Sequence, residues 1–132
     1  MKYLGIDYGA KRIGLAVSVE NIAFPHSVIE NNANVFGVLS GLVDKEKVGC
    51  IIVGDTRTLS GAENPVTPAS DTFVEELKTH VGVPVERAME AMSSIEASRY
   101  AEKGNEHDDA AAAAVILQRY LDMRVSAVDP MR

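Results

Sequence analysis

The chain has 132 residues and a mass of 14.2 kDa, a common size for one domain, and we expect a single domain over residues 1–124 with a short mobile tail over 125–132. Its composition, 46% hydrophobic and 24% charged, is typical of a globular protein and argues against global disorder. Nineteen acidic and thirteen basic side chains give a net charge of −6, which argues against coating of nucleic acid by charge alone but does not exclude a nuclease.

The N-terminal residues are predicted to form three strands. Residues 1–7 have the pattern of a buried strand, Tyr8-Gly-Ala-Lys11 that of a tight turn, and residues 12–19 that of a second strand, so that together they predict a hairpin. A third strand is predicted over 22–29. Pro25 restricts this strand to a sheet edge or a bulge, because proline has no N–H to donate.

A helix is predicted next, over residues 31–47. Valines and leucines recur there at helical spacing, and Asn31 or Asn32 can cap the first turn. Gly37 and Gly41 lie within the helix and weaken it, because glycine loses more backbone entropy than other residues.

The remaining elements alternate between strand and helix. This order predicts an α/β fold with a mixed five-stranded sheet flanked by helices. The predicted elements are a buried strand over 48–54, a loop over 55–65, a helix beginning near Pro68, a strand over 85–89, a helix beginning at Ser93 or Ser94, and a last helix over 109–123.

The cellular compartment is predicted from targeting signals, apolar runs and cysteine content. No signal-peptide pattern begins the sequence, and no apolar run is long enough to span a bilayer. The only cysteine, Cys50, lies in an apolar run, where a small buried residue is expected rather than a reactive thiol. We therefore expect a cytoplasmic protein with no membrane partner.

Three acidic positions are candidates for chemistry. Asp7 ends a buried strand beside a glycine turn, Glu90 follows the strand over 85–89, and Asp109 stands at the head of the last helix, after His107 and Asp108. Each has a simpler interpretation: Asp7 can accept N–H bonds within its own turn, Glu90 can be a solvated surface residue, and either aspartate can cap the helix. His107 is expected to be an exposed loop residue.

If these three carboxylates meet, they suit Mg²⁺ or Mn²⁺, because hard cations prefer oxygen ligands. Such a site can serve phosphodiester cleavage. Zinc is not favoured, since the chain has no cluster of cysteine and histidine ligands.

Two segments resemble the YqgF-type, RuvX-like family of small ribonuclease H-like nucleases, and the resemblance covers most of the chain. They are Gly5-Ile-Asp-Tyr-Gly-Ala-Lys-Arg-Ile-Gly-Leu-Ala-Val-Ser18 and Asp109-Ala-Ala-Ala-Ala-Ala-Val-Ile-Leu-Gln-Arg-Tyr-Leu-Asp122. The resemblance implies a ribonuclease H-like fold and a metal-dependent endonuclease acting on structured nucleic acid. Its expected substrates are the 5′ end of precursor 16S rRNA, slightly favoured, or a Holliday junction, whose two-fold symmetry would suit a homodimer.

Residue by residue, the resemblance implies that Mg²⁺ or Mn²⁺ is held by the catalytic carboxylates of Asp7, Glu90 and Asp109. It also implies contacts to nucleic acid from four further residues, Lys11, Arg12, Ser93 and Ser94.

This chain departs from the family pattern around Glu90. Met89-Glu-Ala-Met-Ser-Ser94 keeps the glutamate and the hydroxyls but lacks the Asp and Arg that usually flank the glutamate, and Asp55-Thr56 replaces a common Leu-Pro. Arg57 or Arg87 could supply the lost positive charge. The departures also allow a catalytically silent protein that binds nucleic acid or assembles ribosomes. A nucleotide-binding protein of the actin and hexokinase type is less compatible, because one domain cannot close a cleft.

Overall fold

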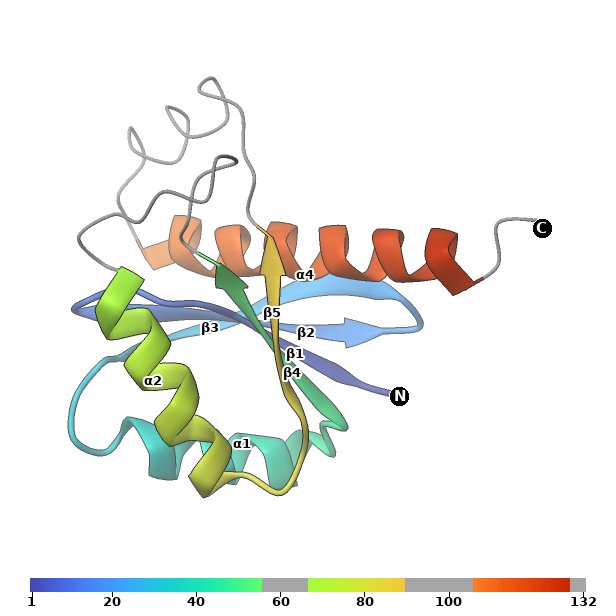
Figure 1. Cartoon of the computed structure of the whole chain (residues 1–132). Coiled ribbons are helices and arrows are strands. Elements are labelled where there is room, and N and C mark those ends of the chain that lie inside the picture. The colour runs from blue at the N-terminus through green and yellow to red at the C-terminus, as the bar shows by residue number, and fades with distance from the viewer. Residues whose placement is uncertain (56–66, 90–105, 129–132) are drawn as a thin grey trace.

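The computed structural model describes residues 1–55, 67–89 and 106–128 of the chain. Together they form one sheet with helices on both of its faces (Figure 1). The elements are β1 (Tyr3–Asp7), β2 (Arg12–Val19), β3 (Ile22–Glu30), α1 (Val35–Glu46), β4 (Cys50–Asp55), α2 (Thr67–His80), β5 (Val85–Met89) and α4 (Glu106–Val128).

The sheet is mixed, as the sequence predicts. Its five strands lie in the order β3-β2-β1-β4-β5. β1 pairs antiparallel with β2, and β2 with β3, whereas β4 is parallel to both β1 and β5. The carboxyl ends of β1, β4 and β5 therefore meet at one edge of the sheet, where parallel strands commonly present functional residues.

Pro25 lies both on an edge strand and at a β-bulge, the two positions predicted for it. It lies in β3, an edge strand, and the register with β2 shifts there, since Leu15 pairs with Ser27 and Ala16 with Pro25. His26 is the extra residue of this bulge. The structure confirms the prediction, because the missing N–H of a proline costs least where no ladder bond is required.

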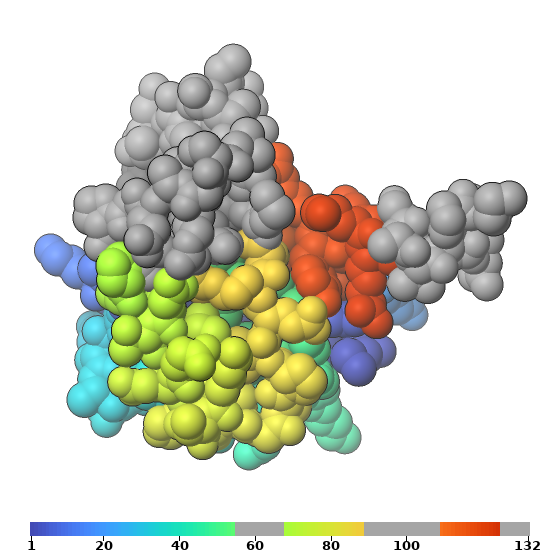
Figure 2. All heavy atoms as spheres, in the orientation of Figure 1, coloured from blue at the N-terminus to red at the C-terminus, as the bar shows by residue number. Residues whose placement is uncertain are grey.

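The two faces of the sheet have separate hydrophobic cores. Leu4 and Ile6 pack with α1 and α2, whereas Tyr3 packs with α4 on the opposite face, as the alternation of a strand requires. α1 and α2 cover one face in Figure 1 and α4 crosses the other. In the space-filling view, α2 and β5 form much of the visible face (Figure 2).

Cys50 belongs to the core beneath α4. Its side chain is buried, which confirms the sequence prediction, and its thiol donates a hydrogen bond of 3.4 Å to Oε2 of Glu86. Burial, followed by this hydrogen bond, raises the pKa of Cys50 to about 11. The thiol is therefore protonated at neutral pH and is a poor nucleophile.

α1 begins later than the sequence predicts. Asn34 is its N-cap residue and makes no side-chain capping bond, whereas Oδ1 of Asn32 accepts the N–H of Asn34 at 2.9 Å. Asn31 and Asn32 therefore belong to the turn before the helix. This correction arises because asparagine stabilises such a turn as readily as it caps a helix.

Gly37 and Gly41 lie in α1 with open space around them, since an added Cβ would meet no heavy atom within 4 Å at either position. We therefore expect Gly37→Ala and Gly41→Ala each to raise the free energy of unfolding by about 0.5–1 kcal/mol, because alanine loses less backbone entropy in a helix. Urea unfolding would measure the gain. A loss of stability in both variants would contradict the packing of α1 described here.

α4 is longer at both ends than the helix predicted over 109–123. It begins at Glu106, so Asp108 and Asp109 lie inside the first turn and neither is the N-cap residue. It continues to Val128 and includes the first four residues of the predicted tail, because helix propagation needs one backbone bond per residue and no apolar face. In the described part of the chain, no helix is both long and apolar enough to cross a membrane.

Candidate active site

Asp7 is the last residue of β1, at the edge where the parallel strands end. It pairs with Gly14 of β2, and the preceding Ile6 pairs with Val53 of β4. Tyr3 and Gly5 face α4, so the alternation of the strand places the side chain of Asp7 on the α4 face as well. The middle of the sheet thus presents a carboxylate toward the head of α4.

Asp109 reaches the same place through a close contact between α4 and the sheet. A Cβ added to Gly14 would lie 2.0 Å from the carbonyl oxygen of Asp109, so the helix backbone rests directly on β2 at this glycine. Gly5 makes a similar contact farther along α4, where an added Cβ would lie 2.7 Å from Cβ of Leu117. Because Gly14 is opposite Asp7, this docking brings Asp109 beside Asp7.

The carboxylate of Asp109 affects the protonation of Asp7. Burial, followed by the negative charge of Asp109, raises the pKa of Asp7 to about 7. No described residue donates a hydrogen bond to the Asp7 carboxylate, so bonding within its own turn does not explain why the residue is there. A partly buried carboxylate without a donor, next to a second carboxylate, suits a divalent cation, which would supply the missing positive charge.

Arg12 is bonded to Asp109. Its Nε lies 3.2 Å from Oδ2 of Asp109, and the two side chains remain 44% and 30% exposed. The guanidinium therefore orients Asp109 from the solvent side. Lys11, next to it, is exposed, and its backbone carbonyl accepts the N–H of Asn31 at 2.9 Å. Contacts of Lys11 and Arg12 with nucleic acid stay predictions.

Several predicted site residues lie outside the described residues, namely Glu90, Ser93, Ser94 and Arg57. In the chain, Glu90 directly follows Met89, the last residue of β5, which pairs with Asp55 at the end of β4. His107 belongs to the first turn of α4. Among the described residues, no group of three or more histidine, cysteine, aspartate or glutamate side chains gathers in a way that could hold a metal ion.

Arg87, which could supply the positive charge missing near Glu90, is bonded to α2 in the structure. Its Nη1 donates to Oγ of the buried Ser70 at 3.0 Å, and its Nη2 lies 3.1 Å from Oδ1 of Asp71. Both partners belong to α2, so Arg87 connects β5 to that helix. The guanidinium of Arg87 thus helps to hold α2 against β5, and its role as a replacement for the arginine missing near Glu90 stays a prediction.

Sequence reasoning missed the contribution of Gly14. Gly14 belongs to the N-terminal motif, but its function in docking α4 depends on a contact between distant parts of the chain. A signal was present, because an isolated glycine within a strand often marks a close approach of another backbone.

Comparison with known proteins shows the family of the chain. The family model described as "RuvX: Holliday junction resolvase" matches residues 1–123. The chain belongs to the RuvX family. Among its RuvX relatives, a protein of Maridesulfovibrio salexigens named "Putative pre-16S rRNA nuclease" is 34% identical, in an alignment that covers 92% of this chain and 98% of the relative. One of Bordetella pertussis with the same name is 38% identical, covering 90% and 92%.

Solved structures show which fold this RuvX protein has. RuvC of Thermus thermophilus in complex with a Holliday junction substrate superposes with a TM-score of 0.62 at 16% identity, covering 95% of this chain and 96% of RuvC. The Fowlpox virus resolvase bound to Holliday junction DNA gives 0.60 at 12% identity, covering 95% and 99%. The ribonuclease H-like fold predicted from the sequence is confirmed.

Proposed function

We propose that this RuvX-family protein is a divalent-metal-dependent endonuclease that hydrolyses phosphodiester bonds in structured nucleic acid, with the 5′ end of precursor 16S rRNA as its substrate. The observation that carries the proposal is the pair of carboxylates at the edge of the sheet, in which Asp7 is partly buried beside Asp109 and has no described hydrogen-bond donor. The names of the two bacterial relatives support precursor rRNA as the substrate.

Asp7 and Asp109, together with Glu90, would hold Mg²⁺ or Mn²⁺. When bound, the cation lowers the pKa of the attacking water and stabilises negative charge on the phosphate. The chain's own residues prepare the site: β1 and Gly14 fix the carboxylates, Arg12 orients Asp109, and the exposed Lys11 is available to a backbone phosphate.

A cleavage assay tests the proposal with two labelled substrates, a precursor RNA that contains the mature 16S 5′ end and a four-way DNA junction. We expect cleavage of the RNA with Mg²⁺ or Mn²⁺ and none with EDTA. Asp109→Asn should lower the rate by at least about 100-fold. Asp109 would bind the cation directly, and loss of a direct ligand costs more than loss of a residue that only orients a ligand. Asp122→Asn, the same change on an exposed residue of α4, is the matched control and should leave the rate unchanged.

Each other outcome has a definite meaning. Cleavage of the junction alone would move the substrate to branched DNA while preserving the site. Binding of RNA without cleavage under either cation would contradict the enzyme and support a silent nucleic-acid binder. Equal rates for the wild type and Asp109→Asn would remove Asp109 from the mechanism. Sedimentation of the complex with a junction would test the homodimer, which stays a prediction.

A further inference from the structure

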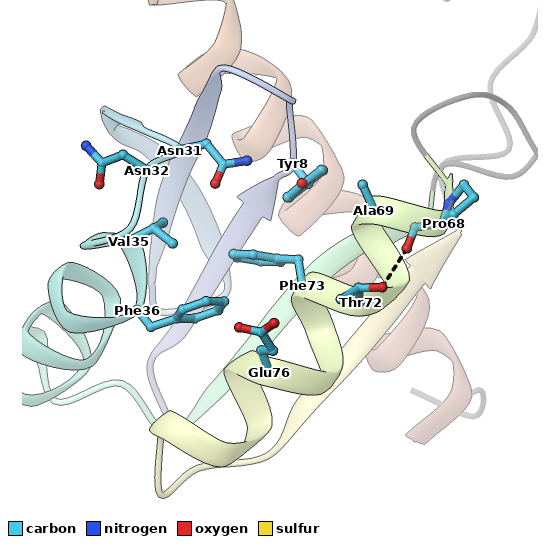
Figure 3. A pocket seen from close by; sticks show the side chains of 10 residues that line it. All are labelled: Tyr8, Asn31, Asn32, Val35, Phe36, Pro68, Ala69, Thr72, Phe73 and Glu76. Carbon is cyan, nitrogen blue, oxygen red and sulfur yellow. Dashed lines mark hydrogen bonds between the residues drawn. The ribbon is translucent and has the colours of Figure 1, made fainter.

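A pocket of about 420 Å³ opens between α1 and α2, on the face of the sheet opposite α4. Figure 3 shows Tyr8 and Asn31 at one end of it, Phe36 and Val35 on the side of α1, and Phe73 and Glu76 on α2. Of the lining residues, Val35 and Phe73 are buried, whereas Tyr8 and Phe36 are only partly buried. Apolar rings are therefore accessible from solvent in a concave site, the usual character of a ligand pocket.

The pocket adjoins the candidate active site through the turn after β1. Tyr8 directly follows Asp7 in the chain, but its side chain packs with the core beneath α1 and α2, on the other face of the sheet. Asn31 is hydrogen-bonded to the same turn, since its Nδ2 donates to the carbonyl oxygen of Gly9 at 2.9 Å. A nucleic-acid strand at Asp7 would thus have the mouth of the pocket within reach over the edge of the sheet.

Three aromatic side chains line the pocket in a continuous row. The ring centroids of Tyr8 and Phe73 are 4.9 Å apart, and those of Phe73 and Phe36 are 5.5 Å apart. Phe73 lies in the middle of this row (Figure 3), and Tyr8, at one end of it, directly follows Asp7 in the chain. Tyr8 is held against Phe73 and remains partly accessible, and a pre-oriented ring of this kind is what stacks on an unpaired base.

Hydrogen-bond acceptors accompany the rings. Because the carbonyl of Gly9 can only accept, the Asn31 amide must turn its NH₂ toward it, which leaves Oδ1 as an acceptor without a described partner. The exposed carboxylate of Glu76 points from α2 toward the pocket (Figure 3). Among the described lining residues there is no lysine or arginine, so this is a poor place for a phosphate and a suitable one for a base that carries N–H donors.

We propose that this pocket binds an unpaired nucleobase of the substrate strand, stacked on Tyr8 and selected for an exocyclic amino group by Asn31 and Glu76. The inference rests on the proposed function for its substrate class. The pocket should bind the bases that carry an amino group, namely adenine, cytosine and guanine, more tightly than uracil. The pocket then places a neighbouring nucleotide while the carboxylates act on the phosphate.

Mononucleotide binding tests the pocket without any cleavage step. The probes are AMP, CMP, GMP and UMP in EDTA, with ribose 5-phosphate as the probe that lacks a base, and the readout is the ¹⁵N NMR signals of the protein. We expect the backbone signals of Tyr8, Thr72 and Phe73 and the side-chain amide signal of Asn31 to shift with the amino-bearing nucleotides, to shift less with UMP, and not to shift with ribose 5-phosphate.

Variants separate stacking from hydrogen bonding. Tyr8→Ala should weaken AMP binding by at least about 5-fold, the lower end of what loss of one aromatic ring costs. Tyr8→Phe, which keeps the ring, should bind AMP as the wild type does and guards against a folding defect. Glu76→Gln should reduce the preference of AMP over UMP, whereas Glu75→Gln, an exposed neighbour paired with Lys78 and outside the pocket, should preserve it.

Equal shifts with ribose 5-phosphate, or wild-type AMP affinity in Tyr8→Ala, would overturn the base pocket. The absence of shifts with every nucleotide would overturn it as well. These results are independent of the nuclease. Loss of cleavage in Asp109→Asn would stand even if the pocket failed, and base binding in EDTA would stand even if no substrate were cut.

Discussion

Asp7→Asn is expected to stabilise the metal-free protein at pH 8 and to lower its cleavage activity strongly. In the folded protein the pKa of Asp7 is raised from 3.8 to about 7, first by burial and then by the charge of Asp109. At pH 8 the folded protein therefore carries a carboxylate that the unfolded chain would ionise more easily. Asparagine removes this penalty, whose upper limit is about 4 kcal/mol for a shift of this size.

The sign of the pH dependence follows from the raised pKa. Below pH 3.8 the carboxyl is neutral in both the folded and the unfolded state, so the wild type and Asp7→Asn should differ little. As the pH rises through about 7, the wild type loses the contribution of the protonated form, and the advantage of the variant should grow until it levels off. Urea unfolding in EDTA at a series of pH values would measure this difference.

The same substitution should lower cleavage by at least about 100-fold, because Asp7 would bind the cation directly and loss of a direct ligand costs more than loss of a residue that only orients one. Added Mg²⁺ should raise the melting temperature of the wild type more than that of the variant, since a ligand stabilises the state that binds it. Asp44→Asn, on the exposed face of α1, is the matched control and should change neither property. A variant that is less stable at pH 8 and still cleaves would contradict both the electrostatics and the role of Asp7.

Gly14→Ala is expected to disturb the active site by steric contact alone. An added Cβ would lie 2.0 Å from the carbonyl oxygen of Asp109 and 2.4 Å from its carbonyl carbon, and these are backbone atoms that cannot rotate away. The head of α4 must therefore move. We expect a loss of stability of at least about 2 kcal/mol, in the range of overpacked cores.

The shift of Asp109 away from Asp7 should also lower cleavage by about 100-fold, because displacements near 1 Å at a catalytic group have effects of this size. Measuring melting temperature and cleavage on the same folded sample would separate the two effects. Gly82→Ala, at a position where an added Cβ meets no heavy atom within 4 Å, is the control and should behave as the wild type. Unchanged stability and activity in Gly14→Ala would show that α4 does not rest on β2 as described.

Local patterns in the sequence predicted every described strand and helix, and they singled out Asp7 and Asp109 as candidate site residues. Alternation, helical spacing and glycine turns predicted all five strands and the three described helices, because these signals record which side of a segment faces the core. Pro25 predicted an edge strand or a bulge, because proline has no N–H to donate. The motif around Asp7 likewise predicted a carboxylate at the end of a strand.

Only the tertiary structure decided how distant residues meet. The approach of Asp109 to Asp7 depends on the register of β1 with β2 and on the docking of α4 against Gly14, which no local pattern records. The pairing of Arg12 with Asp109 and the pocket beside Tyr8 arise in the same way. A residue's neighbours in the chain determine its secondary structure, whereas its chemistry depends on contacts across the sheet that form only when the whole domain has packed.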